Sequence, residues 1–396
     1  MQHRISPSMI GAAHSYRRLL GWYLSESAYT DMLGKPGVID LAFGDPHEYP
    51  TSEMLSVLQR SHTPQHENWF AYLRDDVTAQ ERVAANLSVE LGVGFEPDDI
   101  FVTAGAFAGL ATALRSICHL DDEVVYLSPT WFYYEPMIVA AGATPRCVQL
   151  SGPNWELDLD AIEAAVTERT AAVIVNSPNN PTGVIYSDDQ LAALAECLRA
   201  ASARYERPIY LVSDEAYRRI VFDDLPVPSP ARWYANTIVV HTYTKTLLLP
   251  GERIGYLAIP ETMPDRVVMR EALMISRLVG GWQSPNNNLQ YVMPELDAHR
   301  IPLGPLRARR DRLATAFQVA GFRVRPTKAT FYLLIEAPTP DDWAYSRQLE
   351  AHNLLVLPGS VMGAPGHLRI SLTITDAMVD QVVKRLAEAY PVGTAR

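Results

Sequence analysis

Short apolar runs alternate with helical stretches between residue 52 and about residue 290, and this alternation restricts the possible folds most strongly. The runs are rich in valine and isoleucine, and each is only four or five residues long. They cover residues 99–103, 123–127, 171–175, 209–212 and 237–241. Buried strands that are separated by helices indicate a mainly parallel sheet with helices on its faces. The sequence therefore predicts an α/β fold.

The rest of the chain has a different pattern. Residues 1 to about 36 are predicted to form a helix, followed by a short strand at 38–43. After about residue 291, a helix around 306–319, strands near 321–324, 331–335 and 368–372, and a last helix indicate a compact α+β unit. A chain of 396 residues exceeds the usual size of a single core. We expect an N-terminal arm and small-domain segment (1–48), a large domain (49–290) and a C-terminal small domain (291–396).

Charge and cysteine content exclude several classes of function. A net charge of −11 argues against nucleic acid or an anionic membrane as partner. No stretch approaches the roughly 18 consecutive apolar residues of a membrane span. Cys118, Cys147 and Cys197 lie far apart, without the spacing of metal ligands, and we expect them to be reduced, buried thiols. These features predict a cytoplasmic protein that binds no metal, nucleic acid or membrane.

Unusual polar clusters follow the ends of the predicted strands. They are Thr103-Ala-Gly105, Ser128-Pro-Thr-Trp131, residues 176–183, residues 213–217 and residues 242–253. In an open parallel sheet, ligands bind outside the carboxyl ends of the strands. We therefore expect these clusters to form a single site.

Several of these clusters carry recognisable chemistry. The amides of Gly105 and Ala106 open a predicted helix, and free N–H groups at such a position bind phosphate. Asp214 would be a costly buried charge unless a cation faced it. Lys245 precedes Arg253 by eight residues, which places a potential nucleophilic amine beside a guanidinium that can hold phosphate. Each feature also has a simpler interpretation as a plain turn or a pair of surface cations.

Taken together, the motifs point to a known family. Asn180-Pro-Thr-Gly, Asp214-x-x-Tyr217, and Thr242-x-Thr244-Lys245 followed by Arg253-x-Gly255 occur in this order. The set resembles the fold-type I pyridoxal-phosphate enzymes, specifically the class I/II aminotransferases of the aspartate aminotransferase superfamily, and it spans roughly residues 38–385. The resemblance implies a large domain with a mainly parallel seven-stranded sheet and a smaller α+β domain.

The resemblance also implies roles for individual residues. Lys245 would form an aldimine with pyridoxal 5′-phosphate and later carry a proton, with Asp214 and Tyr217 as further catalytic residues. The implied cofactor-binding residues are Gly105, Ala106, Trp131, Asn180, Asp214, Tyr217, Thr242, Thr244, Lys245 and Arg253, with Tyr72 from the partner of a homodimer. Arg369 would bind the substrate α-carboxylate, assisted by Asn180 and Gly44. For Trp131, a place in the aromatic core is the competing interpretation.

The implied activity is transfer of an amino group from an L-amino acid to a 2-oxo acid. The alternative keeps the fold and cofactor but carries out elimination, cyclisation or oxidation. The stretch 280–285 resembles the segment that enters the partner's site. Two further candidates are Trp282, which lies in this stretch, and Arg277, which lies just before it. Glu48 lies near the expected substrate entrance, where it either receives a basic side chain or is a solvated loop charge.

Overall fold

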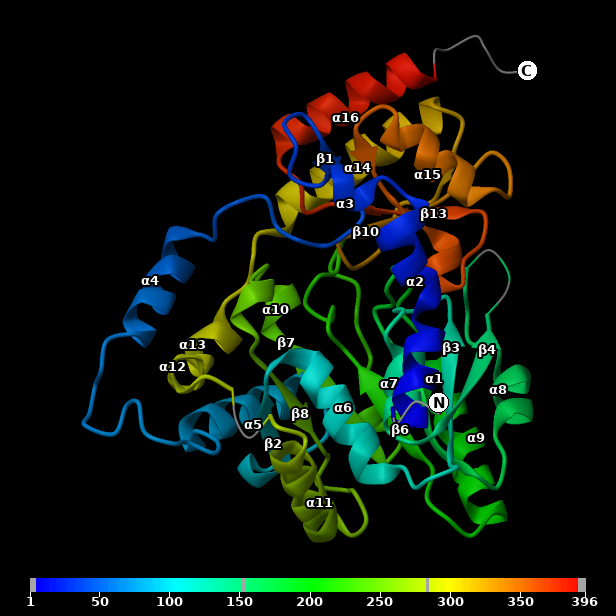
Figure 1. Cartoon of the computed structure of the whole chain (residues 1–396). Coiled ribbons are helices and arrows are strands. Elements are labelled where there is room, and N and C mark those ends of the chain that lie inside the picture. Colours follow the sequence, from blue (N-terminus) through cyan, green and yellow to red (C-terminus); the bar gives the residue numbers. More distant parts are fainter. Residues whose placement is uncertain (1–4, 151, 153, 283–284, 391–396) are drawn as a thin grey trace.

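The computed structural model describes residues 5–150, 152, 154–282 and 285–390. Its chain forms a lower body built on a large sheet and an upper body built on a smaller one (Figure 1). Within the described residues, every helix is too short or too polar to span a bilayer.

The large sheet has seven strands in the order β2-β8-β7-β6-β5-β3-β4. All neighbours pair in parallel except β8, which is antiparallel to both β7 and β2. The strands are β2 (Ile100–Thr103), β3 (Glu123–Ser128), β4 (Thr144–Gln149), β5 (Thr170–Asn176), β6 (Tyr210–Asp214), β7 (Thr237–Thr242) and β8 (Gly255–Ala258). The prediction of an α/β fold with a mainly parallel seven-stranded sheet is confirmed.

Helices cover both faces of this sheet because successive strand residues point to opposite sides. Val124 packs with one core and its neighbour Val125 with another. On the first face lie α6 (Gly105–Ile117), α7 (Tyr134–Ala140) and α11 (Arg266–Val279). The second face is covered by α4 (Ser52–Ser61), α5 (Val77–Leu91), α8 (Leu159–Ala165), α9 (Asp188–Arg204), α12 (Asn287–Tyr291) and α13 (Met293–Ala298). A short helix, α10 (Tyr243–Thr246), follows β7.

The upper body is built around an antiparallel four-stranded sheet in the order β12-β13-β10-β9. Its elements are β9 (Arg323–Val324), β10 (Tyr332–Glu336), β12 (Leu357–Pro358), β13 (His367–Ser371), α14 (Leu303–Val319), α15 (Asp342–Glu350) and α16 (Asp376–Ala389). Beside it, β1 (Ile39–Asp40) pairs in parallel with β11 (Leu354–Leu355). The N-terminal segment therefore contributes a strand to the upper body.

The predicted long N-terminal helix is wrong. The structure has three short helices, α1 (Pro7–Ser15), α2 (Arg17–Gly21) and α3 (Tyr29–Met32), with a wider π-turn over Trp22–Glu26. The N-terminal segment contacts both bodies. Tyr16 donates a hydrogen bond to the Tyr133 hydroxyl of the lower body at 2.6 Å, and Trp22 is fully buried in a core with Leu355 and Leu357 of the upper body. Figure 1 shows α1 and α2 running from the lower to the upper body.

The boundary between the two bodies stays a prediction, and we propose to place it near residue 300. Val292, Met293 and Leu296 pack in the same core as Val83 and Leu87 of α5, so they belong with the large sheet. The first core residue of the upper body after them is Leu306.

The cysteine prediction needs correction. Cys147 lies on β4 at the edge of the sheet and is exposed, whereas Cys118 and Cys197 are half-buried. Edge strands tolerate proline and polar residues because one side of the strand meets solvent. This also explains why β4, with the sequence TPRCVQ, has no apolar run that would have revealed it.

Candidate active site

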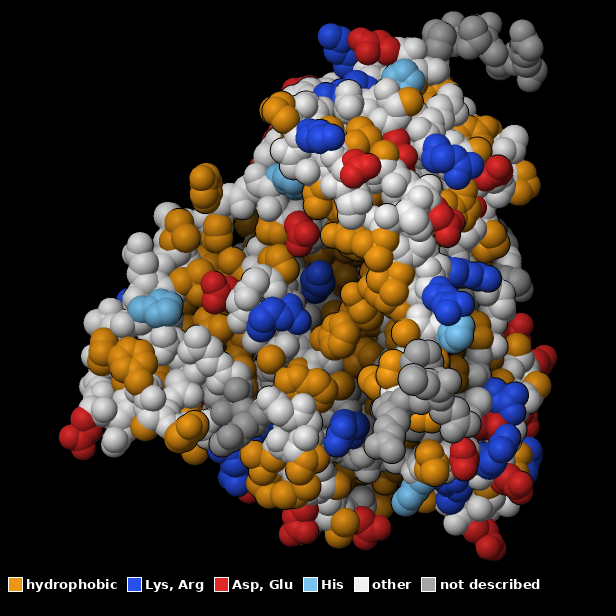
Figure 2. Space-filling view, in the orientation of Figure 1, with side chains coloured by type: hydrophobic (Ala, Val, Ile, Leu, Met, Phe, Trp, Pro, Cys, Tyr) orange, Lys and Arg blue, Asp and Glu red, His pale blue; other side chains and the backbone are white. Residues whose placement is uncertain are grey.

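The carboxyl ends of five strands meet at one edge of the large sheet. In the register of the sheet, Asn176 lies opposite Asp214, and Thr103 and Thr242 both lie opposite Gly255. These strand ends open into a cavity with a volume of about 320 Å³, which is in the range of small-molecule sites. Figure 2 shows a hollow in the middle of this face, with hydrophobic side chains along its edge and lysine or arginine side chains beside it.

Most of the predicted site residues line this cavity. They are Gly44, Ala106, Trp131, Asn180, Asp214, Tyr217, Thr242, Thr244, Lys245, Arg253 and Arg369. Gly105 lies directly behind them, because a Cβ atom on it would come within 3.0 Å of Arg253 Nη2. Tyr72 does not line the cavity of its own chain and is 99% exposed.

One end of the cavity has the chemistry of an anion site. Helix α6 begins at Gly105 without a side-chain cap, so its first N–H groups keep no partner within the helix. The hydroxyls of Thr242 and Thr244 lie 2.7 Å apart beside it, and Arg253 lines the same end. These donors fit a phosphate.

The glycines of this end are required by close packing. Gly105 has φ +78°, a conformation in which other residues are strained, and a Cβ on it would also approach Thr242 Oγ1. A Cβ on Gly255 would lie 2.4 Å from the His241 carbonyl oxygen and 3.2 Å from Gly105 Cα. The spacing Arg253-x-Gly255 thus lets β8 approach β7 and the start of α6.

Asp214 is a buried carboxylate that lines the same cavity. It accepts hydrogen bonds from the Tyr134 hydroxyl at 2.5 Å and the Ala216 amide at 3.1 Å. Burial raises the pKa of Asp214 to about 6, an effect only partly offset by these hydrogen bonds. Among the residues that the structure describes, no lysine, arginine or histidine forms an ion pair with it. A protonated ring nitrogen would supply the missing cation.

This pKa has a consequence for stability that can be measured. Folding raises the pKa of Asp214, so between about pH 4 and pH 6 the native state retains a proton that the unfolded chain releases. The cofactor-free protein should therefore lose about 3 kcal/mol of unfolding free energy from this group as the pH rises through that window. Urea unfolding measures the free energy of unfolding of wild type and of Asp214→Asn. The wild-type value should fall relative to that of the variant as the pH rises from about 4 to about 7. A difference that is independent of pH would contradict the assignment.

Arg369 also lines the cavity and is held by neutral groups. Its guanidinium donates to the Ala42 carbonyl at 2.6 Å and to Asn180 Oδ1 at 3.1 Å, and it lies 4.1 Å from the centre of the Tyr332 ring. Its Nε atom is buried without a hydrogen-bond partner. The side chain is thus fixed in position but keeps donor capacity for an incoming carboxylate.

Gly44 belongs to the same wall through its backbone. A Cβ on this residue would meet the Phe331 ring and the Tyr332 hydroxyl, both at 2.4 Å. The preceding turn is anchored by Asp40, which accepts hydrogen bonds from Tyr29 and from the Ala42 amide at 2.7 and 2.8 Å. The loop can therefore pack against Phe331 and Tyr332 only with glycine at position 44.

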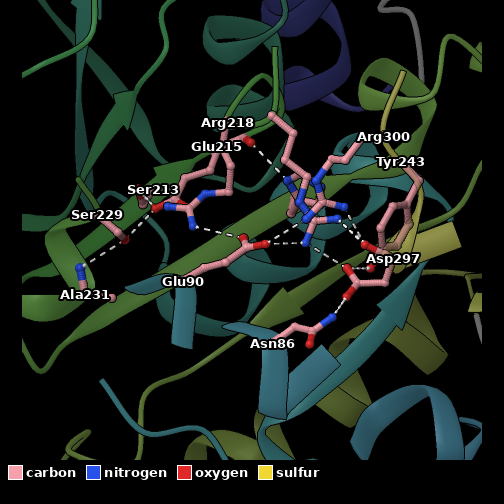
Figure 3. Close-up of polar contacts among 12 residues, drawn as sticks. Asn86, Glu90, Ser213, Glu215, Arg218, Ser229, Ala231, Tyr243, Asp297 and Arg300 are labelled. Carbon is pink, nitrogen blue, oxygen red and sulfur yellow. Dashed lines mark hydrogen bonds and ion pairs between the residues drawn. The ribbon is translucent and has the colours of Figure 1, made fainter. Parts of the chain in front are cut away.

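A buried network of charged side chains includes Glu215, the residue after Asp214, and reaches Tyr243, two residues before Lys245 (Figure 3). Asp297 accepts hydrogen bonds from the Tyr243 hydroxyl at 2.7 Å and from Asn86, and it pairs with Arg219 at 2.9 Å. Glu215 pairs with Arg218 at 2.8 Å. Tyr243, between the two threonines of the anion site, thereby joins the loop of Lys245 to α5 and α13.

Removing Asp297 should leave buried hydrogen-bond donors of this network without their acceptor. Asp297→Ala is expected to lower the free energy of unfolding by about 2–3 kcal/mol, because the buried Tyr243 hydroxyl and Arg219 lose this carboxylate, while Arg219 keeps its ion pair with Glu90 at 2.9 Å. The matched control is Asp380→Ala on the surface, where loss of the exposed pair with Arg312 should cost at most about 1 kcal/mol. Urea unfolding measures both values, and equal stabilities of the two variants would contradict a structural role for the network.

Two of the remaining sequence hypotheses are changed by the structure. Arg277 is buried and binds Asp75 through both terminal nitrogens at 2.6 Å, so it is not free to enter a neighbouring site. Glu48 pairs with the buried Arg309 at 2.5 Å and is therefore an anchored charge. Trp282 is half-buried, and the two residues after it lie outside the described part of the chain.

Several residues of the site were not among the sequence predictions, and three of them have clear contacts. Tyr134 holds Asp214, Asn176 donates to the Asp214 carbonyl and accepts from the Asn180 amide, and Phe107 lines the cavity. Asn176 ends a predicted strand next to the Asn180 motif, which was a usable signal. Tyr134 ends the aromatic run Trp131-Phe-Tyr-Tyr134, and nothing in the local sequence distinguishes it from its neighbours.

Comparisons with known proteins agree with this geometry. Residues 36–386 match the family described as aminotransferase class I and II. The chain is 30% identical to a probable aspartate/prephenate aminotransferase of Aquifex aeolicus, over 78% of this chain and 80% of that protein. It is 31% identical to a probable N-succinyldiaminopimelate aminotransferase of Mycobacterium tuberculosis, over 77% and 76%.

Solved structures give the same result. An amino transferase from Eubacterium rectale superposes with a TM-score of 0.87 at 26% identity and full coverage of both chains. A mutant aspartate aminotransferase of Thermus thermophilus superposes with a TM-score of 0.78 at 26% identity, covering 91% of this chain and 98% of that one. These relatives are named for amine transfer, which favours that reaction over elimination, cyclisation or oxidation.

Proposed function

Because the chain belongs to the class I and II aminotransferases, we propose that it moves the amino group of an L-amino acid to a 2-oxo acid with pyridoxal 5′-phosphate in the cavity beside Lys245. The family is generally dependent on this cofactor. Aminotransferase activity follows from the family. The cofactor, the roles of the residues and the homodimer are our proposals.

One observation carries the proposal. Lys245, Arg253 and Arg369 all line the cavity, and no carboxylate among the described residues forms an ion pair with any of them. Asp214, in the same cavity, has no cationic partner within that part of the chain. Other buried charges, such as Glu123, have close partners. Unpaired charges in a cavity are costly unless a ligand completes them.

The proposed ligand matches this distribution of charge. Its phosphate would be held by the amides of Gly105 and Ala106, the hydroxyls of Thr242 and Thr244, and Arg253. Asp214 would keep the ring nitrogen protonated, Asn180 and Tyr217 would donate to the ring oxygen, and Trp131 would cover the ring face. Pyridoxal phosphate supplies an aldehyde that reacts with amines and a ring that accepts electrons from the substrate α-carbon.

Residues of the chain itself would bind the substrate and transfer the proton. Arg369 would bind the substrate α-carboxylate through two parallel hydrogen bonds, with Asn180 and the backbone at Gly44 completing that site. This anchoring would orient the α-hydrogen toward Lys245. Lys245 Nζ would take up the proton from the substrate α-carbon as a general base. It would then return the proton to carbon C4′ of the cofactor as a general acid.

We also propose that the active site is completed in a homodimer. Tyr72 is exposed in the single chain and lies in the segment between α4 and α5, which runs along the outer edge of the lower body (Figure 1). A side chain of this kind could reach the phosphate of a partner subunit. Sedimentation analysis should give the mass of two chains, and a monomer with full activity would contradict this proposal.

Amine transfer itself is tested with a panel of L-amino acids and 2-oxo acids. The proposed function predicts a new amino acid formed in equal amount to the new 2-oxo acid. Release of ammonia or peroxide without transfer, across the whole panel, would contradict it.

A further inference from the structure

We propose that the preferred amino donor has a bulky apolar, above all aromatic, side chain and carries no second carboxylate. This inference rests on the proposed function, which places the substrate α-carboxylate at Arg369. It deepens that function by placing the substrate side chain in the part of the cavity that the cofactor and the α-carboxylate do not occupy.

The remaining wall of the cavity is aromatic. Its aromatic side chains include Phe43, Phe107, Phe132 and Tyr133, and Asp45 and Ala216 also line the cavity. Phe107 meets Tyr133 edge to face with 4.9 Å between ring centres, and Phe132 lies 4.9 Å from Tyr133. Phe132 also lies 6.5 Å from Phe43 at an angle of 88°. Such edge-to-face arrangements favour a further ring beside them.

This wall is fixed rather than loose. The Tyr16 ring stacks on Tyr133 at 4.9 Å between centres and donates a hydrogen bond to its hydroxyl. Phe43 packs against Tyr29, which is itself buried. Phe107, by contrast, is 36% exposed, so part of its ring is available to a ligand. A preformed aromatic surface binds a flat apolar side chain without first having to be ordered.

Among the described residues of this chain, the cavity has no cation left for a second carboxylate. Its lysine and arginine residues are Lys245, Arg253 and Arg369, and the proposed function engages all three. Arg277, which the sequence offered as a further candidate, is bound to Asp75 and buried. Asp45 also lines the cavity and would repel a second carboxylate. A carboxylate placed against this wall would be desolvated without a partner, which is costly.

The test compares two donors with the same 2-oxo acceptor and the purified, cofactor-loaded enzyme. We expect kcat/KM for L-phenylalanine to exceed that for L-aspartate by about 100-fold or more, because the second carboxylate of aspartate would lose its hydration against the aromatic wall without gaining a cationic partner. Aspartate used as well as or better than phenylalanine would overturn the inference while leaving amine transfer intact. Absence of transfer from every donor would instead contradict the proposed function.

A substitution in the aromatic wall tests whether this wall causes the preference for phenylalanine over aspartate. Phe107→Arg adds a cation where the ring is exposed, and it should lower the phenylalanine-to-aspartate ratio of kcat/KM by about 10-fold or more, since it removes apolar contact and supplies a partner for the carboxylate. Leu120→Arg adds the same charge at a position that is 80% exposed and outside the cavity. It should keep the wild-type ratio. An unchanged ratio in Phe107→Arg, or an equal change in Leu120→Arg, would overturn the assignment.

Discussion

Replacing Lys245 with alanine is expected to abolish amine transfer, with a fall in kcat of at least about 10,000-fold, because the variant loses both the amine that holds the cofactor and the group that carries the proton. Lys245 lines the cavity on the short helix after β7, and its Nζ lies 5.8 Å from the centre of the Phe331 ring. The folded structure should survive, since no described carboxylate pairs with this lysine. Steady-state rates with a saturating donor measure the effect.

The matched control for this variant is Lys384→Ala. The Lys384 side chain is 78% exposed on α16 and pairs only at long range with Glu388. Its replacement should leave kcat unchanged. Activity of Lys245→Ala within 10-fold of the control would mean that another group performs the proton transfer.

Asp214→Asn is expected to lower kcat by about 100- to 10,000-fold while leaving the shape of the cavity nearly unchanged. The amide cannot stabilise a positive charge on the ring nitrogen, so the cofactor would accept electrons less well. Tyr134→Phe removes only the hydrogen bond to Asp214 and keeps the carboxylate. It should therefore cost less activity than Asp214→Asn. Measurements of kcat for both variants at one pH distinguish loss of charge from loss of positioning, and equal losses would contradict the proposed role of the charge.

The regular part of the fold could be predicted from local sequence. The buried strands β5, β6 and β7 are continuous apolar runs, and the polar residues after them meet because parallel strands end at the same edge. The edge strand β4 was missed, since a strand that is partly exposed carries no such run. The N-terminal segment was predicted as a single helix because its breaks depend on contacts with distant rings such as Tyr133.

Charges in the site were predictable by type but not by partner. Asp214 and Lys245 were identified through motifs that follow a strand, whereas Arg369 was implied only by the family resemblance. The pairs that decide the roles of Arg277 and Glu48 join residues 202 and 261 positions apart. Nothing in the local sequence indicates such pairs, so an arginine that serves packing and one that serves binding look alike before the fold is known.

The central claim is that Lys245 carries the cofactor, and the most direct measurement is mass spectrometry of peptides after borohydride reduction of the cofactor-loaded enzyme. Reduction converts the bond between an amine and the cofactor aldehyde into one that survives digestion. We predict a phosphopyridoxyl group on the peptide that contains Lys245 and on no other lysine at comparable occupancy. A label on a different lysine, or none in protein that is active in amine transfer, would contradict the account.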